Sequence, residues 1–566
     1  MAEHADRITR GRSTGGTGRR APPRPKGRQV EPAALEEVRA LLGAAPRSRD
    51  FLLDHLHRLQ DRFGHLSARH LAALAHELRL AQAEVFEVAS FYAHFDLVME
   101  GEAPPPPLTV RICDGISCEL AGAGTLAEAV GAAVPSGVRV LRAPCMGACD
   151  RAPAAAVGHR SIAPATPDMV AAALSGAPED AVPPSSLLAA YRAAGGYRLL
   201  EDCLQGRRTA EDVIAILEDG ALRGMGGAGF PTGRKWHFVR SGPAPRMMAV
   251  NADEGEPGTF KDRHFLLTDP HRVLEGMLVA AWAVGAGQVV FYLRDEYPDC
   301  RAVLERELAA VEAAGLSRHA SVRLVRGAGA YICGEESAML ESIEGRRPLP
   351  RHKPPFPAQS GLFGRPTLIN NVETLYWVRD VVERGPSWWA AQGRNGAKGL
   401  RAYSVSGRVR EPGVKIVPAG TTLNELVAEH CGGMAQGHRL KAYLPGGASG
   451  GLLPASMADL PLDFGVLEPH GCFVGSGAVV VLSDRDDLRQ VALNLLRFFA
   501  DESCGQCTPC RVGTEKAVTL IEKAPGEHAL LEDLARVMTD ASICGLGQAA
   551  MNPVRAILRH FPEALS

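Results

Sequence analysis

Eight of the thirteen cysteines in this 566-residue chain fall into two groups of four, and their spacing constrains the fold more than any other feature. The first group pairs C-x4-C in RICDGISC with C-x3-C in APCMGAC. The second group has the run CGQCTPC, followed at a distance by the cysteine of SICGLG. Thirteen cysteines are too few for a disulfide scaffold in a chain of this length. Each group therefore predicts a thiolate site that joins distant segments.

Iron–sulfur clusters are the metal centres that this spacing favours, because each group supplies four thiolates. A C-x2-C-x2-C run can wrap one loop around three corners of a [4Fe–4S] cubane, whereas two separate pairs suit a [2Fe–2S] cluster. Structural zinc is the alternative, but four-cysteine zinc sites usually combine two C-x2-C pairs. Glycines adjoin several cysteines, at Gly147, Gly505 and Gly545, where the backbone must approach sulfur closely. The predicted ligands are Cys113, Cys118, Cys145 and Cys149 for [2Fe–2S], and Cys504, Cys507, Cys510 and Cys544 for [4Fe–4S].

Length and composition suggest a soluble, multidomain chain. A chain of 566 residues exceeds what one core usually organises. The net charge of −2 gives no support to nucleic-acid binding. The longest uncharged run, from Met277 to Leu293, is short for a membrane span, and Gly285 and Gly287 divide it into a predicted helix and strand. With no apolar signal-peptide core at the start, we expect cytoplasmic residence without membrane insertion.

Composition and periodicity divide the chain. Residues 1–30 are basic and rich in Gly and Pro, so we expect a disordered arm. The next segment, to about residue 100, has helical periodicity, with Gly64 as a helix stop and Ser67 as an N-cap. After the stiff stretch APPPP, LTVRIC and VRVLRAPC are predicted strands that deliver cysteines at their ends. Three further short strands, YSVSGRV, KAYLPGG and GAVVVLSD, precede helical stretches that flank the second cysteine group.

The stretch LRGMGGAGFPTGRKW has literal G-x-G-x-x-G spacing at Gly224, Gly226 and Gly229. The dinucleotide fingerprint requires a preceding strand, whereas the upstream TAEDVIAILEDGAL is helical in pattern, so an ordinary Rossmann site is not expected. The loop either binds phosphate through its backbone N–H groups, with Arg234 and Lys235 supplying charge, or is a tight structural turn.

A strand–loop–helix pattern occurs in VRLVRGAGAYICGEES, where Gly327 and Gly329 follow an apolar run and a helix begins near Glu335. This order can present phosphate to amides near a helix start. Glu335 and Glu336 would repel a phosphate, so they either accept hydrogen bonds from ribose or nicotinamide, or favour the positive helix end. Between the glycine loops, VNADEGEPGTFKDR is an acidic turn, either part of the site or a solvated loop.

Together these motifs resemble one family. GMGGAGFPTGRKW, NADEGEPGTFKDR, GAGAYICGEES, LINNVETL and ESCGQCTPCRVGT closely resemble the NADH-binding, FMN-containing flavoprotein subunit of respiratory complex I and its soluble relatives. The first cysteine group resembles the thioredoxin-like [2Fe–2S] subunit of the same systems, here fused upstream. The fusion and the stretch DFLLDHLHRLQDRFGHLSARHLAAL most resemble the β subunit of NAD-dependent formate dehydrogenases that contain molybdenum or tungsten. The diaphorase subunits of NAD-reducing hydrogenases are close relatives.

The resemblance covers residues 31–566 and implies a multidomain fold of α/β and α+β class. Its parts are a helical bundle over 31–100, a thioredoxin-like [2Fe–2S] domain over 107–178, a Rossmann-like FMN and NADH domain over 190–395, a ubiquitin-like β-grasp domain over 400–483 and a helical [4Fe–4S] domain over 485–566. One departure concerns the first glycine motif, where the family commonly has Arg and this chain has Met225.

The resemblance also implies the cofactor contacts. FMN would be bound by the loop from Gly327 to Glu336 and by two asparagine-containing turns, while an aromatic ring, a lysine and two carboxylates line the nicotinamide site. The implied residues are Gly224, Gly226, Gly227, Gly229, Phe230, Lys235, Asn251, Asp253, Glu254, Glu256, Gly327, Gly329, Tyr331, Gly334, Glu335, Glu336, Asn370, Asn371 and Thr374. Of these, Phe230, Lys235, Glu256 and Glu335 belong to the nicotinamide side.

The implied function is a diaphorase that passes electrons between NAD and iron–sulfur clusters through FMN, because NADH delivers two electrons and a cluster accepts one. Hydride transfer itself needs no acid or base. The implied partner is the molybdopterin-containing catalytic α subunit of a formate dehydrogenase. The alternatives are a hydrogenase diaphorase subunit, a complex I flavoprotein subunit and an electron-transfer scaffold without NADH chemistry, to which Met225 alone points.

Overall fold

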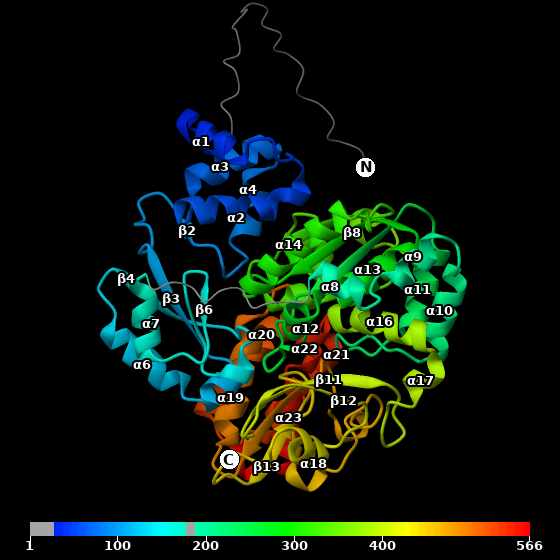
Figure 1. Ribbon diagram of the computed structural model, residues 1–566. Helices are drawn as coiled ribbons and strands as arrows, with labels where there is room; N and C mark the ends of the chain where they lie inside the picture. The colour runs from blue at the N-terminus through cyan, green and yellow to red at the C-terminus, as the bar shows by residue number, and fades with distance from the viewer. Residues whose placement is uncertain (1–27, 177–186) are drawn as a thin grey trace, which may run out of the picture.

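The computed structural model describes residues 28–176 and 187–566, and it divides into four structural blocks along the chain (Figure 1). The basic arm predicted over residues 1–30 lies outside the described residues except for its last three. Among the helices that the structure describes, none is both long enough and apolar enough to cross a membrane.

The first block is helical, as predicted. Gly64 ends one helix in the left-handed region, with a φ of 74°, and the Ser67 side chain caps the next by accepting from the His70 N–H. Two short parallel strands, β1 and β2, pair the segment between α2 and α3 with the segment after α4. The elements are α1 (Pro32–Leu42), α2 (Leu52–Phe63), β1 (Leu66–Ser67), α3 (Ala68–Leu78), α4 (Gln82–Ala89) and β2 (Leu97–Val98).

The second block is a four-stranded sheet of order β4-β3-β5-β6 with helices beside it. The two predicted strands are confirmed as β3 and β4, which pair in parallel and carry Cys113 and Pro144–Cys145 at or just after their ends. The elements are β3 (Leu108–Cys113), α5 (Ile116–Leu120), α6 (Ala123–Ala133), β4 (Val138–Ala143), β5 (Ala155–Val157), β6 (Arg160–Ile162) and α7 (Pro167–Leu174).

The third block is built on a parallel sheet of order β10-β7-β8-β9. The uncharged run from Met277 divides as predicted, because α13 ends at Val284, Gly285 takes a left-handed φ of 71° and β8 follows. The elements are α8 (Leu188–Ala193), α9 (Arg198–Leu204), α10 (Ala210–Asp219), α11 (Thr232–Ser241), β7 (Arg246–Ala252), α12 (Lys261–Thr268), α13 (Pro270–Val284), β8 (Ala286–Leu293), α14 (Pro298–Ala313), β9 (Ser321–Arg326), α15 (Glu336–Ile343), β10 (Thr367–Asn371), α16 (Val372–Arg384) and α17 (Pro386–Ala390).

The last block combines a mixed five-stranded sheet, of order β12-β11-β15-β13-β14, with a helical bundle. The three predicted strands are β11, β13 and β15, and the predicted helices around the second cysteine group include α19 and α21. The elements are β11 (Leu400–Gly407), β12 (Gly413–Pro418), α18 (Leu423–Glu425), β13 (Leu440–Leu444), β14 (Leu453–Pro454), β15 (Ala478–Ser483), α19 (Leu488–Asp501), α20 (Thr508–Lys523), α21 (His528–Ala541), α22 (Gly545–Ala549) and α23 (Asn552–His560).

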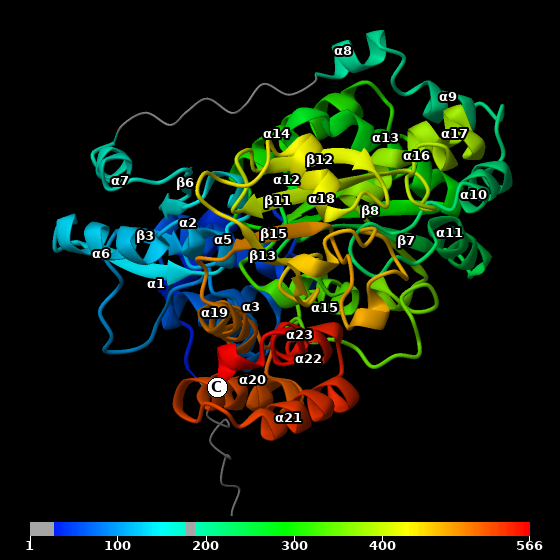
Figure 2. The same cartoon turned by 90° about the horizontal axis from the view of Figure 1, so that it is seen from below.

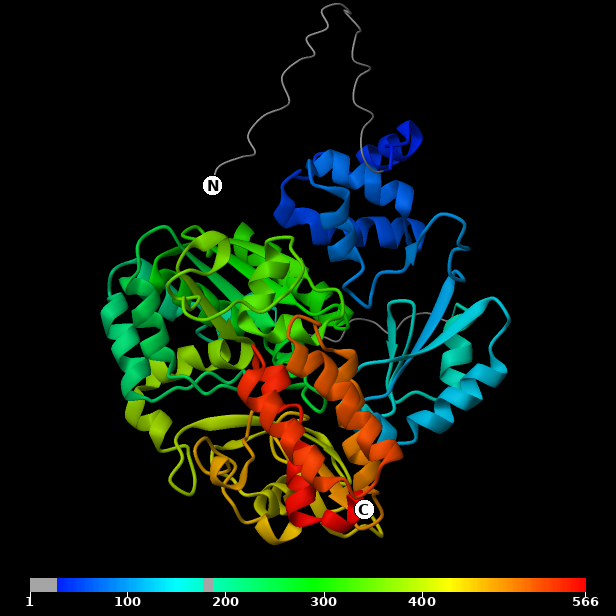
Figure 3. The same ribbon diagram turned by 180° about the vertical axis from the view of Figure 1, so that it is seen from behind.

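One hydrophobic core connects the blocks. It runs from the amino-terminal helices, through one face of the parallel sheet and α15, into the carboxy-terminal bundle. The other face of that sheet packs on α10, α11, α13 and α16. Figures 2 and 3 show the carboxy-terminal helices gathered beside the five-stranded sheet and the second block. The blocks therefore form one continuous body, in which loops from different blocks can meet.

Candidate functional site

The site begins where the strand order of the parallel sheet reverses, between β7 and β10. In open α/β sheets, ligands bind in the crevice at such a point, beyond the carboxyl ends of the strands. Asn251 lies at the end of β7 and its amide donates to the Gly334 carbonyl, 2.9 Å away. Asn371 ends β10 and caps α16 by accepting from the Glu373 N–H at 2.9 Å. The predicted asparagines are thus brought to one crevice.

The first glycine loop covers this crevice. It lies between α10 and α11, so the helical pattern predicted upstream is confirmed and the loop is not a strand-to-helix Rossmann turn. The Met225 N–H donates to the Thr374 hydroxyl at 2.9 Å, and the Met225 side chain is buried. A Cβ on Gly226 would lie 3.1 Å from that of Asn371, so only glycine fits this approach without displacement. Trp236 and Lys235, from α11, donate to Asn370 and to the Ile369 carbonyl.

The second glycine loop follows β9 and leads into α15. Glu335 is the N-cap of this helix and accepts hydrogen bonds from the Ser337 and Ala338 N–H groups, both at 2.9 Å. Of the two roles left open for Glu335, the structure shows the helix-end role. The Lys353 ammonium lies 3.0 Å from the Glu335 carboxylate and 2.7 Å from that of Glu336. These ion pairs reduce the negative charge that the two carboxylates would otherwise present to a ligand.

The acidic turn is buried, so the solvated-loop alternative is wrong. Glu254 is 7% exposed, and its carboxylate accepts from the Asp262 and Arg263 N–H groups and from the Tyr297 hydroxyl. Glu254 therefore anchors the start of α12. The Glu256 carboxylate accepts from both the N–H and the hydroxyl of Ser449, each at 2.7 Å, and from the Tyr331 hydroxyl. Burial raises the pKa of the Glu256 carboxyl, while these hydrogen bonds act in the opposite direction.

Asp253 lies in this turn beside the second glycine loop. Its Oδ2 atom is buried without a hydrogen-bond partner among the described residues, and burial raises the pKa of its carboxyl well above the usual value. A buried carboxylate oxygen without a partner is costly unless a ligand donates to it. Glycine-rich backbone, an unpartnered acceptor and asparagine side chains in one crevice fit the phosphate and hydroxyl groups of FMN.

The four cysteines of the first group meet inside the second block. Cys113 and Cys118 come from the end of β3 and from α5, and all four are at most 5% exposed. The Cys145 and Cys149 sulfur atoms lie 3.4 Å apart, and the Gly147 N–H points at the Cys145 sulfur from 3.5 Å. Arg294, from the third block, donates to the Cys145 carbonyl at 2.6 Å.

The four cysteines of the second group line one small cavity together with Ile332. Cys507 immediately precedes α20 and Cys544 immediately precedes α22, so helix starts point toward the cavity. Burial raises the pKa of Cys510 to about 11 and that of Cys544 to about 12. A metal centre in this cavity would supply the positive charge that stabilises such buried cysteines as thiolates.

The second glycine loop borders the cavities of both cysteine groups. Tyr331 and Asp253 line one small cavity together with Cys145. The next residue, Ile332, lines the cavity of the second cysteine group. The loop that would carry the flavin therefore lies near members of both groups.

Several residues of the site were not predicted from the sequence. Phe238 exposes 49% of its surface, and its ring centroid lies 6.4 Å from that of Phe230, itself 42% exposed. Phe356, 54% exposed, lies three residues after Lys353 in the chain. Lys353 was also missed. The motif HKPPFP, in which Lys353 and Phe356 flank two prolines, was a signal in the sequence, since a rigid turn presents both side chains.

Comparison with known families assigns most of the chain. The Nuo51 FMN-binding domain matches residues 217–380, and the NADH-ubiquinone oxidoreductase-F iron–sulfur binding region matches residues 490–566. A thioredoxin-like [2Fe–2S] ferredoxin matches residues 38–177, and an SLBB domain matches residues 403–453. These matches confirm the predicted fold class and the predicted FMN, [4Fe–4S] and [2Fe–2S] cofactors.

Similar proteins decide the family. An F-type NADH-quinone oxidoreductase subunit of Rhizobium meliloti is 44% identical over 395 residues, which are 67% of this chain and 94% of that protein. The F-type subunit of Aquifex aeolicus is 40% identical over 387 residues, 66% of this chain and 89% of that protein. The chain belongs to this family of NADH-quinone oxidoreductase F-type subunits. Its further amino-terminal part carries the fused thioredoxin-like [2Fe–2S] domain.

A solved structure shares the whole fused architecture of this F-type family member. A chain of an air-oxidised NAD+-reducing [NiFe]-hydrogenase is 34% identical and has a TM-score of 0.80, covering 92% of this chain and 93% of that chain. The protein is thus an NADH dehydrogenase-type flavoprotein oxidoreductase subunit. The zinc alternative for the cysteine groups is not favoured, since both groups fall within iron–sulfur family matches.

Proposed function

We propose that this chain is the NAD(H)-reactive diaphorase subunit of a multisubunit dehydrogenase, and that it passes electrons between NAD(H) and a metal-containing partner. One observation carries the proposal: the second glycine loop lies at the sheet crevice and also lines cavities that members of both cysteine groups line. A flavin held there is adjacent to both clusters. Bound FMN supplies the conversion between two-electron transfer with NAD(H) and one-electron transfer with clusters.

The FMN contacts fall to residues on the crevice side of the two glycine loops and the turns after β7 and β10. Asp253 offers its unpartnered oxygen to a hydroxyl, and the first loop offers backbone N–H groups to a phosphate. Met225 does not abolish this role, because the backbone of the loop stays anchored to Thr374. The assigned residues are Gly224, Gly226, Gly227, Gly229, Asn251, Asp253, Gly327, Gly329, Tyr331, Gly334, Asn370, Asn371 and Thr374.

NAD(H) binds on the exposed side, where the aromatic rings lie. The faces of Phe230, Phe238 and Phe356 are free to stack on a base. Glu256 holds Tyr331 and the Ser449 backbone at the inner edge, and the lysine–glutamate pairs at Glu335 and Glu336 border the outer edge. The chain's contribution is to hold nicotinamide against flavin and to exclude water, since hydride transfer needs no proton donor.

The cysteines divide between the clusters as their positions suggest. We assign Cys113, Cys118, Cys145 and Cys149 to the [2Fe–2S] cluster, and Cys504, Cys507, Cys510 and Cys544 to the [4Fe–4S] cluster. The second group has two partly exposed members, Cys507 and Cys544, and so offers the shorter exit to a partner protein. The first group is enclosed, which suits an electron reservoir.

Three partners are candidates, and each has its own support. The solved structure that shares the fused architecture is a hydrogenase, which favours a hydrogen-oxidising partner. The F-type relatives are subunits of NADH-quinone oxidoreductases, which favours a quinone-reducing partner.

The amino-terminal stretch DFLLDHLHRLQDRFGHLSARHLAAL resembles formate dehydrogenase β subunits, which favours a partner with molybdenum or tungsten bound to molybdopterin. The comparisons support the first two partners better than this one. The electron-transfer module is the same in all three cases, because the hydrogen, quinone or formate chemistry resides on the partner.

The test is to purify the chain from its native host with the proteins that accompany it. NAD+ reduction is then measured with hydrogen and with formate, and NADH oxidation with a quinone, beside the NADH-dependent reduction of ferricyanide. We expect ferricyanide reduction with any of the three partners, and activity with one of hydrogen, formate and quinone. A chain that holds FMN and both clusters but does not oxidise NADH would refute the diaphorase and favour the scaffold.

A further inference from the structure

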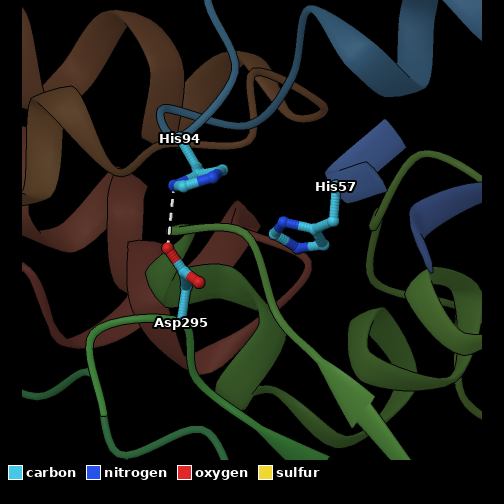
Figure 4. Close-up of side chains that lie close together, drawn as sticks. All are labelled: His57, His94 and Asp295. Carbon is cyan, nitrogen blue, oxygen red and sulfur yellow. Dashed lines mark ion pairs between the residues drawn. The ribbon is translucent and has the colours of Figure 1, made fainter. Parts of the chain in front are cut away.

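Two clusters of titratable side chains contact segments that form the flavin crevice. The first cluster, at the contact between the first and third blocks, contains His57, His94 and Asp295 (Figure 4). His57 Nε2 lies 2.8 Å from the Gly327 carbonyl of the second glycine loop. Both Asp295 oxygens are engaged, one by His94 Nδ1 at 2.8 Å and the other by the Arg326 guanidinium. This cluster is thus paired internally, and it joins the two blocks.

The second cluster is buried at the start of α12, within the motif GTFKDR. Lys261 is 1% exposed, and its ammonium lies 2.7 Å from the Asp262 carboxylate and 3.1 Å from that of Glu373. Burial lowers the pKa of Lys261, but the charges of Asp262 and Glu373 outweigh this effect and raise the pKa above its usual value. Lys261 is therefore a charged ammonium, which can only donate hydrogen bonds.

This cluster determines how the Asn371 amide is turned. Asn371 Oδ1 lies 3.4 Å from the Lys261 ammonium and accepts from the Glu373 N–H at 2.9 Å. Asn371 Nδ2 donates to the Asp262 carboxylate at 2.6 Å. A reversed amide would place Nδ2 against two donors and Oδ1 against a carboxylate, so only one orientation is compatible with these partners. Both acceptor positions of Oδ1 are then occupied, whereas Nδ2 retains a second hydrogen.

The first glycine loop lies directly against this amide. A Cβ added to Gly226 would lie 3.6 Å from Asn371 Cγ and 3.9 Å from Asn371 Nδ2. The second Nδ2 hydrogen therefore lies near the loop whose backbone N–H groups are assigned to a phosphate. A donor suits that place, because phosphate oxygens accept hydrogen bonds and would repel an amide oxygen.

We propose that Lys261 and Asp262 are positioning residues for the FMN phosphate. They hold the Asn371 side chain so that it presents an N–H, and not its carbonyl oxygen, beside the first glycine loop. The inference rests on the proposed function, which assigns FMN to this crevice. Neither residue needs to touch the flavin, because both act through Asn371. Lys261 fixes the carboxylate and the amide together, since its three hydrogens face Asp262, Glu373 and Asn371.

The deciding variant is Asp262→Asn, which keeps the shape of the side chain. The Asp262 carboxylate uses one oxygen for Lys261 and the other for Asn371, whereas an amide offers a single oxygen. Lys261 and Glu373 remain paired, so no buried charge loses its counter-charge. If Asp262 acted through its charge alone, its removal would strengthen phosphate binding. The positioning role predicts the opposite sign.

The test compares FMN with riboflavin, which lacks the phosphate. It uses the full chain with its clusters, from which bound flavin has been removed, and measures both dissociation constants by quenching of flavin fluorescence. In Asp262→Asn we expect the FMN constant to rise about 10-fold or more, because a hydrogen bond to a charged group is lost, and the riboflavin constant to change less than about twofold.

The matched control is Asp380→Asn. Asp380 is also a buried carboxylate paired with an arginine, Arg272, but it lies about two turns further along α16 from Asn371. This variant should keep the ratio of the two flavin affinities. Urea unfolding of both variants shows whether their stabilities are comparable.

Lys261→Met keeps the proposal testable if Asp262→Asn does not fold, since methionine fills a similar volume but donates no hydrogen bond. We expect the same selective loss of FMN. Equal losses of FMN and riboflavin would overturn the proposal and leave these residues a structural role. Unchanged or tighter FMN binding would also overturn it. An unaltered chain that binds neither flavin would instead refute the proposed function.

Discussion

The two cysteine groups are assigned to the same kind of cofactor but are enclosed in different ways. The first group is at most 5% exposed, and residues from another block complete its surroundings: Arg294 donates to the Cys145 carbonyl, and Phe260 packs on Cys145 and Cys149. The second group also has neighbours from the third block, Ile332 and Arg347, but keeps Cys507 and Cys544 partly exposed. Buried residues of the flavin domain therefore close the first pocket, whereas the second stays partly open.

The largest difference concerns electron delivery. Cys504→Ala removes a ligand of the exposed cluster and should abolish NAD+ reduction driven by the partner, while NADH-dependent ferricyanide reduction at the flavin continues. Cys118→Ala, in the enclosed group, should leave most of the partner-driven activity. Both activities are measured on the purified complex, with cluster content followed by electron paramagnetic resonance. If only Cys118→Ala lost the partner-driven activity, the first cluster would be the exit to the partner and the second cluster the reservoir.

Two arginines test the dependence on other blocks. Arg294 and Arg347 each donate to a cysteine carbonyl, Cys145 at 2.6 Å and Cys504 at 3.0 Å, but Arg294 is 5% exposed. Arg294→Met leaves the Glu296 carboxylate and the carbonyls without their partner, so the free energy of unfolding should fall by about 3–5 kcal/mol. Arg347→Met should cost about 1 kcal/mol. Denaturant unfolding checks both, and equal losses would contradict the comparison.

Two glycines give a smaller contrast. A Cβ on Gly147, at a φ of 67°, would lie 2.3 Å from the Tyr297 hydroxyl oxygen, so Gly147→Ala must displace a side chain of the flavin domain. A Cβ on Gly505, at a φ of 76°, meets its nearest atom at 3.8 Å, on Arg347. We expect Gly147→Ala to lose most of its [2Fe–2S] cluster. Gly505→Ala should keep its [4Fe–4S] cluster and cost about 1–2 kcal/mol of backbone strain. Iron content and visible absorption decide between these outcomes.

The most gradual effect is a pH dependence at Glu254, whose hydrogen bond to Tyr297 supports the packing against Gly147. Burial, followed by the nearby Asp262 charge, raises the pKa of Glu254 to about 7. Between about pH 4.5 and 7 the Glu254 carboxyl is ionised in the unfolded chain but protonated in the folded chain. The free energy of unfolding therefore falls as pH rises through this range and is constant above it. The total decrease is roughly 1–3 kcal/mol.

Glu254→Gln should remove this slope. Glu312→Gln, an exposed carboxylate on α14, is the control and should keep it. The measurement is the free energy of unfolding at several pH values between 5 and 8. A slope that is unchanged in Glu254→Gln would show that another buried carboxyl dominates.

Local features of the fold were predictable because short-range physics determines them. Gly64 and Ser67 mark a helix end and a helix start through their own backbone and side-chain geometry. The division of the uncharged run at Gly285 follows from the same local preference for a left-handed backbone. The cysteine spacing likewise indicated the type of each cluster. A C-x2-C-x2-C loop can hold three corners of a [4Fe–4S] cubane, whereas two separate pairs suit a [2Fe–2S] cluster.

Contacts between distant residues were not predictable. Glu256 meets Ser449, and Arg294 meets the Cys145 carbonyl, across more than a hundred residues of chain. Glu335 was a candidate ligand contact from its sequence position, yet its side chain caps α15 because the loop ends there. No spacing rule relates such pairs, since their approach depends on how the blocks pack.

The sequence by itself determined the chemically important residues of this protein. They are two groups of four cysteines and two glycine loops, with the helices and strands that carry them. The tertiary structure alone decided that the second glycine loop borders the cavities of both cysteine groups, and that His57, His94 and Asp295 lie close together. The physical reason is that one hydrophobic core joins the blocks. Burial of that shared surface fixes which loops face each other, and no local segment contains this information.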